Sequence, residues 1–475
     1  MPIFRLHTRA TEAAFAEQRR VDPFGHRLHA MLAALWCFLA CGPTSIVEVG
    51  LIPALLCFAI RAPRHLRVDW RFIHLTAAQL TLLWIAWVAC STQWSANRSL
   101  GLDEVMANRF ALSLVILWPV LDKRSWLIAG LVCGFLAANL AQAAHAVGSA
   151  LDLSWLQFPR QVHRNSGWWQ PVVGGSMLTA ALGLHLPAAL TGSLRTRAVG
   201  VAGGAVSFVG VLATGSRGAW VASAALVAVA ALWALWRARK GAGRRAGGAG
   251  AAGSPAGLRP GHLPLVAALL FLIGLGAQQA LWPSIRERGA RGVDEIRAAL
   301  HERDYSTDTG ARVLMAEVAV RAFLSHPVRG VGAGGFRAWG RAWLIADGRG
   351  HSAALLHDHA HNTILHVAAT TGLIGAGLLV CLVGVSIRGG LWNPDPDAGP
   401  VAGYAAGPAM ALVGLVLVSA FDVIPMNAQT SALFWTLVVL CLWGRPREAR
   451  GPGASVEDPA ALAPDVSEQA AGIAR

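Results

Sequence analysis

A run of alternating histidines lies directly before a long apolar segment of the chain. His357, His359 and His361 are separated by single residues, one of which is Asp358. Because imidazole titrates near neutral pH, a histidine here can accept the proton of an attacking hydroxyl group. Alternating histidines can also bind zinc, with Asp358 as a further or outer ligand, although no distant fourth ligand stands out. The run therefore predicts a general base, and it leaves open a metal site and a polar interface without chemistry.

Two arginines could bind an anion near that base. Arg217 interrupts an apolar region, where a guanidinium costs about 2.5–3.5 kcal/mol at the centre of a membrane helix, a cost that is usually tied to function. Arg312 begins a polar helical segment, and guanidinium groups bind phosphate oxygens in pairs. The alternatives are that Arg217 reaches the lipid headgroups and that Arg312 is a solvated helix charge. Arg160 and Arg164 form a possible basic rim for acceptor phosphates, or ordinary loop charge.

A glycine run follows the polar helix. Residues 330–335 satisfy a dinucleotide-binding fingerprint, but they follow a helix and Pro327 instead of a strand, so we reject that reading. The glycines instead predict a backbone that passes close to neighbouring helices. Trp339 and Trp343 could stack on sugar rings, but an interfacial aromatic belt is the favoured interpretation.

The composition places these residues in a membrane protein. Of 475 residues, 55% are apolar and 14% are charged, which is more apolar surface than a fold of this size buries in water. The net charge of +14 comes from basic residues in short loops, as on the cytoplasmic side of membrane proteins, and not from a basic domain that would bind nucleic acid. The seven cysteines fall inside apolar runs and indicate no disulfide framework.

The predicted fold is an all-α bundle of about twelve transmembrane helices with one long, partly helical periplasmic loop. The spans are expected at residues 29–42, 44–60, 71–91, 105–121, 125–147, 171–192, 197–213, 218–236, 263–282, 361–387, 402–420 and 428–443. The remaining segments are a cytoplasmic tail at 1–28, helices one to nine at 29–282 with a basic flexible linker at 237–262, the loop at 283–360, helices ten to twelve at 361–443 and a disordered cytoplasmic tail at 444–475.

This topology places the candidate residues on one side. With a cytoplasmic N-terminus, every expected inside loop is basic, and Arg217, the long loop and the histidine run all face outward. Within the loop, residues 285–300 and 311–325 have helical spacing, and Ser306 to Asp308 are cap-forming residues. The arginines and histidines can therefore meet although they are far apart in the chain.

Three elements together resemble the O-antigen ligase family, whose superfamily includes O-antigen polymerases and protein O-oligosaccharyltransferases. They are Ser216-Arg217-Gly218-Ala219, then the Arg312 helix with His326-Pro327 and the glycine run to Phe336, and then His359-Ala360-His361-Asn362 with Thr371-Gly372-Leu373-Ile374-Gly375. The resemblance is clearest from residue 203 to residue 377.

The resemblance implies transfer of a glycan from undecaprenyl pyrophosphate to an acceptor hydroxyl at the periplasmic face of the bacterial inner membrane, without a nucleotide sugar, metal or other cofactor. It implies that His361 is the base, that His359 supports it, and that Arg217 and Arg312 bind the pyrophosphate. The acceptor expected is the lipid A-core oligosaccharide.

The sequence also departs from the family pattern, and other functions fit parts of it. His357 and His366 are additional histidines, which leaves open which imidazole reacts. Ligation is favoured over polymerisation or protein glycosylation because the chain ends soon after its last span. A transporter is less favoured because the polar residues gather at one face instead of the membrane midplane, and a metal-dependent membrane hydrolase is a further alternative.

Overall fold

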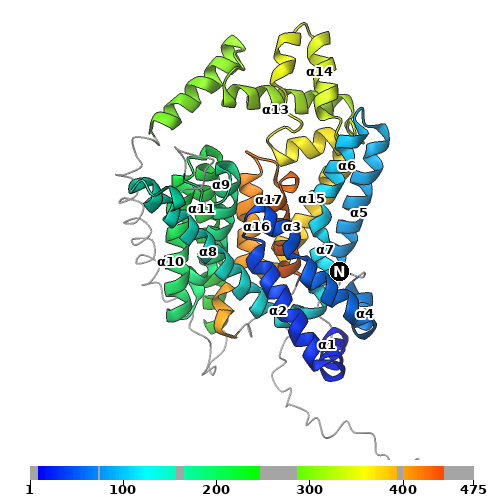
Figure 1. Ribbon diagram of the computed structural model, residues 1–475, viewed down its shortest axis with the longest axis vertical. Helices are drawn as coiled ribbons and strands as arrows, with labels where there is room; N and C mark the ends of the chain where they lie inside the picture. Colours follow the sequence, from blue (N-terminus) through cyan, green and yellow to red (C-terminus); the bar gives the residue numbers. More distant parts are fainter. Residues whose placement is uncertain (1–8, 73–74, 157–164, 247–285, 393–398, 443–475) are drawn as a thin grey trace, which may run out of the picture. The chain divides into compact units, whose positions relative to one another are not determined.

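The computed structural model describes residues 9–72, 75–156, 165–246, 286–392 and 399–442 (Figure 1). In these residues every regular element is a helix, so the all-α prediction is confirmed. The α-helices are α1 Arg9–Val21, α2 Pro23–Leu39, α3 Thr44–Gly50, α4 Ile52–Phe72, α5 Thr76–Ser91, α6 Arg98–Ala107, α7 Leu112–Leu117, α8 Arg124–Ala150, α9 Pro171–Thr191, α10 Leu194–Ala213, α11 Arg217–Ala246, α13 Asp308–Ser325, α14 Phe336–Ala346, α15 Thr363–Trp392, α16 Gly407–Val418 and α17 Ala428–Cys441.

Six helical segments are long and apolar enough to cross a membrane, which makes the chain a multi-pass membrane protein. They are Thr44–His65, Arg98–Ala150, Pro171–Thr191, Leu194–Ala213, Arg217–Lys240 and Thr363–Trp392, and α16 and α17 are shorter apolar helices. The number of twelve spans stays a prediction, and the span expected at 263–282 lies outside the described residues.

The segment expected as a span at 105–121 lies within the candidate span Arg98–Ala150, but it is not one continuous helix. The chain here passes from α6 through the 3-10 turn Arg109–Ala111 into the short helix α7 and the 3-10 segment Trp118–Lys123. The side-chain amide of Asn108 donates to the carbonyl of Glu104 at 3.0 Å, and Pro119 has no backbone N–H to donate. Both residues favour breaks in a continuous helix.

Helical structure extends into the predicted N-terminal tail and into the linker that was predicted to be flexible. Helix α1 and the start of α2 lie within the predicted N-terminal tail, and Asp22 caps α2 by accepting from the backbone N–H of Gly25 at 3.0 Å. Helix α11 continues to Ala246, so the first part of the predicted linker is helical.

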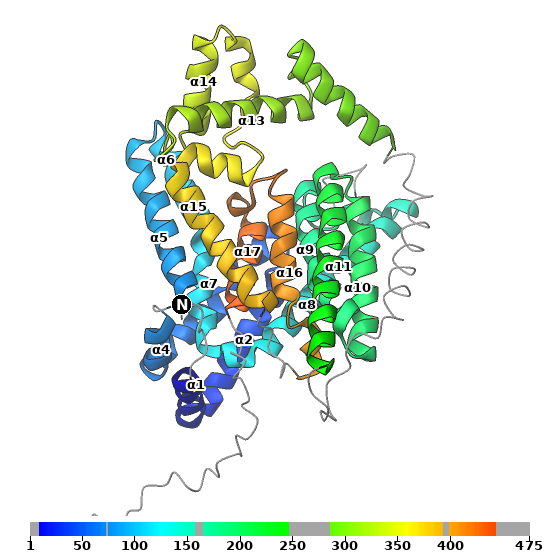
Figure 2. The same cartoon turned by 180° about the vertical axis from the view of Figure 1, so that it is seen from behind.

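Helix α9 occupies the centre of the bundle. It packs against α10, α11 and α16, and nearly its whole length is buried. Small residues permit this packing, because a Cβ added at Gly183 would lie 2.5 Å from the carbonyl oxygen of Met410. Both ribbon views show α16 and α17 between the α9, α10 and α11 group and the α5 and α15 pair (Figures 1 and 2).

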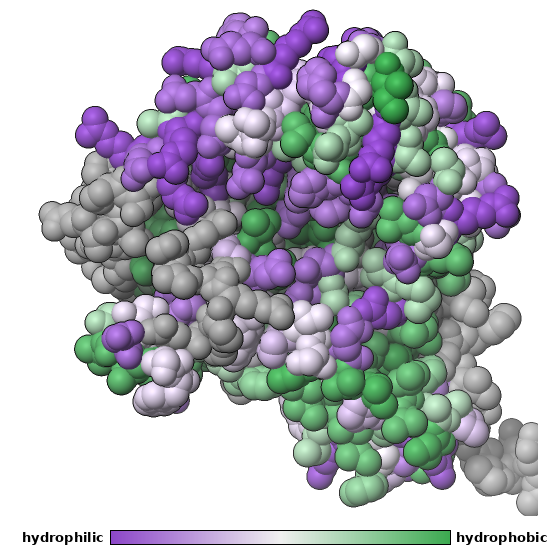
Figure 3. Space-filling model, turned by 45° about the horizontal axis from the view of Figure 1, so that its top comes forward, coloured by the Kyte–Doolittle hydropathy of each residue, from purple (hydrophilic) through white to green (hydrophobic). Residues whose placement is uncertain are grey.

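The polar segment after residue 285 forms a helical layer over one end of the bundle (Figure 1). It contains a helix at 286–297, the π-helical turn Ala298–Glu302, α13, α14 and the 3-10 helix Gly350–Leu355. The predicted cap of α13 is confirmed, since the Thr307 hydroxyl accepts from the backbone N–H of Gly310 at 3.0 Å. Hydrophilic side chains gather over this layer, whereas hydrophobic ones cover much of the helices below it (Figure 3).

The glycine run joins this layer to a break in α15. Gly372 has a φ of 67°, and the backbone N–H groups of Val331 and Gly332 donate to the carbonyls of Ala369 and Thr370 at 2.9 and 2.8 Å. A Cβ at Gly330 would lie 2.3 Å from the Thr370 carbonyl carbon, so the predicted close approach of the backbone is confirmed. These bonds satisfy polar groups that the broken helix would leave exposed, and they fix α15 against the layer.

Candidate active site

Three distant segments meet at the loop between α16 and α17. A Cβ at Gly218, the second residue of α11, would lie 2.4 Å from Cβ of Phe421. From α13, Nη1 of Arg312 donates to the carbonyl of Phe421 at 3.4 Å, and His361 lies beside Asp422. The structure therefore brings the α11 terminus, Arg312 and the histidine run to one loop. The sequence predicted that the arginines and histidines meet, but it did not indicate the loop itself.

Arg217 is held by the polar layer. Its Nη1 donates to Oε2 of Glu295 at 3.1 Å and to the Thr309 hydroxyl at 3.2 Å. A Cβ at Gly292 would lie 2.2 Å from that nitrogen, so a larger residue here would displace the guanidinium from its present position. Burial raises the pKa of the Glu295 carboxyl, but hydrogen bonds from Thr309 and Arg217 outweigh it and lower the pKa below its usual range. Glu295 is thus an ionised partner of Arg217.

Arg312 has a different environment. It is half-buried on the first turn of α13, and its hydrogen bond to the Phe421 carbonyl leaves other N–H groups of the guanidinium available. No ion pair within the part of the chain that the structure describes includes Arg312. A guanidinium in this position can bind an anion without first releasing a carboxylate.

The three histidines of the run form one cluster. The ring centroids of His359 and His361 are 4.4 Å apart, and those of His357 and His361 are 5.3 Å apart. Burial, together with the neighbouring His361, lowers the pKa of His359 to about 4, so His359 is neutral near pH 7. A neutral imidazole can accept a hydrogen bond or a proton or bind a metal ion.

His361 is held in a strained conformation. Its φ of 49° lies in the left-handed region, which costs a residue with a side chain of its size about 1–3 kcal/mol. Asn362 stabilises the turn, because its Oδ1 accepts from the backbone N–H of Leu365 at 2.9 Å and its amide donates to the Ala420 carbonyl at 3.0 Å. Such strain often marks a functional position.

Asp422 faces this imidazole. Its Oδ1 lies 3.7 Å from Nδ1 of His361, and the two side chains are 14% and 18% exposed, respectively. Burial raises the pKa of Asp422, but His361 and the backbone N–H of Val423 lower it more, so its pKa falls below the usual range. An ionised carboxylate beside an imidazole orients the ring and favours its protonated form, as a general base requires.

Residues 202–380 match the model of a family described as O-antigen ligase. The chain carries an O-antigen ligase domain. The match covers the segment in which the sequence resembles the family, and that prediction is confirmed. No match was found among curated proteins.

The O-antigen ligase domain contains Arg217, Arg312, His359 and His361, but Asp422 lies beyond its matched residues. Sequence reasoning missed Asp422 because it belongs to no motif and follows a span expected to end at residue 420. The one available signal was an acid between two apolar runs. Thr363 fixes its loop, since the Thr363 hydroxyl donates to the Asp422 carbonyl at 2.9 Å and accepts from the backbone N–H of Ile424 at 3.0 Å.

Asp358, a possible metal ligand in the sequence analysis, has a different partner. Asp358 pairs with Arg337 of α14 at 3.2 Å, whereas Asp422 is the acid paired with His361. Arg160 and Arg164 lie outside the described residues. Among the described residues, the ligand atoms of His359, His361 and Asp422 lie within 4.8 Å of one another, so these three could hold a metal ion.

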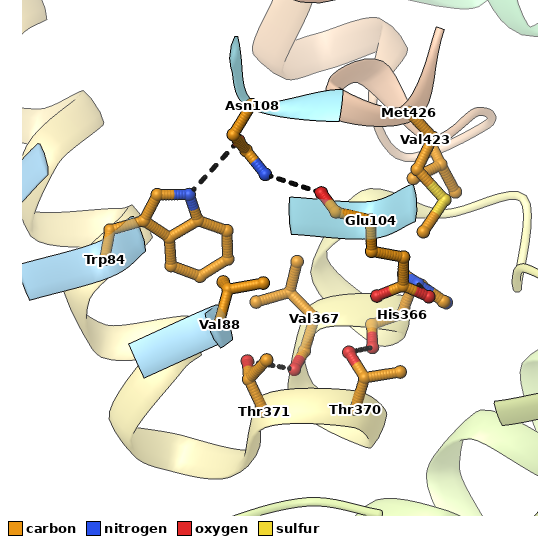
Figure 4. Close-up of a pocket in the computed structure, with 10 residues that line it drawn as sticks. All are labelled: Trp84, Val88, Glu104, Asn108, His366, Val367, Thr370, Thr371, Val423 and Met426. Carbon is orange, nitrogen blue, oxygen red and sulfur yellow. Dashed lines mark hydrogen bonds and ion pairs between the residues drawn. The ribbon is translucent and has the colours of Figure 1, made fainter. Parts of the chain in front are cut away.

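His366 lines a pocket between α5, α6, α15 and the loop that follows Asp422, from which Val423 and Met426 contribute (Figure 4). Its side chain is 2% exposed, and its Nε2 lies 3.4 Å from Oε1 of Glu104. The pocket also contains Asn108, which accepts from the indole N–H of Trp84 at 3.4 Å. Its volume of about 30 Å³ is enough for a water molecule. His366 thus pairs with a different acid from His361, and the sequence gave no indication of Glu104.

Proposed function

We propose that this O-antigen ligase-type protein transfers a glycan from undecaprenyl pyrophosphate to a hydroxyl group of the lipid A-core oligosaccharide at the periplasmic face of the bacterial inner membrane. The observation that carries the proposal is the meeting of Arg217, Arg312, His361 and Asp422 around one loop. Two guanidinium groups and a histidine with an acidic partner are the groups that this reaction needs. The family of residues 202–380 supports the same class of reaction.

In the proposed reaction, His361 is the general base. Its Nδ1 faces Asp422, so Nε2 is the nitrogen that receives the proton of the acceptor hydroxyl. The hydroxyl oxygen bonds to the anomeric carbon of the glycan as the bond from that carbon to the pyrophosphate oxygen breaks. A single displacement of this kind inverts the configuration at the anomeric carbon. Asp422 stabilises the imidazolium formed.

The electron pair of the broken bond passes to the pyrophosphate, and the guanidinium groups of the arginines stabilise the negative charge that develops there. Arg312 can bind a phosphate oxygen directly, whereas at Arg217 the carboxylate of Glu295 competes with the donor for the guanidinium. The helix dipole at the start of α11 adds a favourable potential for an anion. His359, neutral and beside His361, supports the base without a competing charge.

Among the four histidines, His361 is favoured as the base for two reasons. It has the contact with Asp422, and its side chain is partly exposed, so that a substrate can reach it. His366 is buried and pairs with Glu104, which favours a structural role. His357 is exposed at the edge of the cluster.

The acceptor and the other partners follow from the same proposal. Both substrates are lipids, so entry from the outer leaflet between helices is expected, and Arg160 and Arg164 remain a candidate rim for acceptor phosphates. Polymerase and protein O-oligosaccharyltransferase activities use the same donor chemistry. A deletion strain separates them: free polymer with bare lipopolysaccharide core indicates a ligase, a single repeat on the core a polymerase, and an unglycosylated pilin a protein transferase. A transporter would instead lose flux across the membrane.

Transfer of a labelled glycan by the purified full-length protein tests the proposal. We expect product from the wild type and loss of product from Arg217→Ala, Arg312→Ala and His361→Ala at normal protein abundance. Arg297→Ala and His351→Asn are matched controls, because both residues are exposed in the polar layer. Full activity in all three site variants would refute the site, and no transfer by the wild type to any acceptor would refute the function.

A further inference from the structure

His359, His361 and Asp422 form a group that the ligase reaction uses for proton transfer but whose composition also suits a metal ion. Two imidazoles and one carboxylate are ligands that Zn²⁺ commonly has in proteins. The ligand atoms lie within 4.8 Å of one another. In a tetrahedral zinc site with bonds of about 2.0–2.2 Å, ligand atoms are roughly 3.3 Å apart, so small side-chain rotations would bring the three together.

The surroundings of the group favour such binding. The two imidazoles come from residues separated only by Ala360, and the carboxylate comes from the loop between α16 and α17, which Thr363 fixes to the start of α15. These contacts therefore position the three ligands relative to one another before any ion binds.

We propose that His359, His361 and Asp422 bind one Zn²⁺ ion, with water in the fourth position, and that this ion reversibly blocks glycan transfer. The blockade rests on the function proposed above, whereas the binding does not. A neutral imidazole has one nitrogen lone pair, and its other nitrogen carries a proton. When zinc takes the lone pair of His361, neither ring nitrogen can accept the proton of the acceptor hydroxyl.

Partial exposure makes the site accessible to an ion from solution. The His361 and Asp422 side chains are 18% and 14% exposed, and His359 is half-buried. His357 is exposed at the edge of the cluster, and its ring centroid is 5.3 Å from that of His361. It can therefore bind an incoming ion before that ion reaches the three ligands. The distant ligand that the sequence did not indicate for a zinc site is therefore Asp422.

The test uses untagged full-length protein in detergent, freed of metal with a chelator that is then removed. Zinc chloride is titrated by calorimetry, and Co²⁺ reports the ligand geometry through its visible absorption. We expect one ion per chain for the wild type and for the control His351→Asn, which removes an exposed histidine outside the cluster. His359→Asn and Asp422→Asn should each weaken binding by more than the 10- to 100-fold that loss of an outer partner costs.

The transfer assay supplies the second measurement. Zinc at saturation should reduce transfer by the wild type and by His351→Asn to background, and a chelator should restore it. The proposal is overturned if no one-to-one binding occurs, if both ligand variants bind as the wild type does, if bound zinc leaves transfer unchanged, or if chelation abolishes transfer. One-to-one binding by a protein that transfers no glycan would support the binding site and refute the proposed function alone.

Discussion

Replacing Asp422 by asparagine removes the charge beside His361 while it preserves the local fold. Asp422 Oδ1 accepts from the backbone N–H of Val423 at 2.9 Å, and the amide oxygen of asparagine can retain that bond. The contacts with Thr363 involve the Asp422 carbonyl and not its side chain, so the loop should keep its place.

The magnitude follows from the distance between the two groups. At 3.7 Å an ionised carboxylate and an imidazolium attract one another by about 4 kcal/mol if the effective dielectric constant is about 20. Both side chains are partly exposed, which reduces this to roughly 2–3 kcal/mol. Since each factor of ten in rate corresponds to about 1.4 kcal/mol, we expect kcat to fall roughly 30- to 150-fold with little change in KM.

The assay is initial-rate transfer from a lipid-linked donor by purified protein, with saturation curves for donor and acceptor. Asp358→Asn is the matched control, because this acid lies three positions from His361 in sequence yet pairs with Arg337. We expect the control to keep wild-type kcat. Equal kcat for wild type and Asp422→Asn would refute the role of the carboxylate, and a selective rise in KM would show that it binds substrate instead of assisting the base.

Three further predictions concern neighbouring groups. Glu295→Gln should lower the KM for the donor, because an ionised carboxylate no longer competes with the donor for Arg217, and an unchanged KM would contradict this competition. The stability that the Glu295 carboxylate contributes should be present above its ordinary pKa of 4.5 and should be lost as pH falls through its lower folded-state pKa. Gly372→Ala should destabilise the protein in thermal unfolding by at least the roughly 1–2 kcal/mol that a left-handed residue costs, since the φ of Gly372 is 67° and an added Cβ would lie 2.2 Å from a backbone oxygen. Gly384→Ala on the same helix, with open space around it, should have no such effect, and equal melting temperatures for the two variants would refute the argument. Glu104→Gln should lower the free energy of unfolding by about 1–3 kcal/mol because it leaves a buried imidazole without its acid, and Asp103→Asn, an exposed acid beside it, should have little effect in the same denaturant titration.

The local elements of this protein could be predicted because their signals are local. Apolar runs of sufficient length predicted helices such as α5, α8, α9 and α10 near their observed bounds, and cap-forming residues predicted the start of α13. The breaks within the span expected at 105–121 were not predicted, because hydropathy does not register where Asn108 and Pro119 disturb the backbone hydrogen bonds of a helix.

The sequence by itself determined that the chain is a membrane protein with an O-antigen ligase domain, and it identified two arginines and a histidine run, because residue type and spacing carry that information. Only the tertiary structure decided which acid each histidine faces: Asp422 for His361 and Glu104 for His366. These pairs join segments far apart in the chain, and they depend on the packing of α6, α15 and the loop after α16, which no local pattern encodes. The break in α15 at Gly372 is of the same kind, since a helix in the membrane can open only where another segment satisfies its backbone groups.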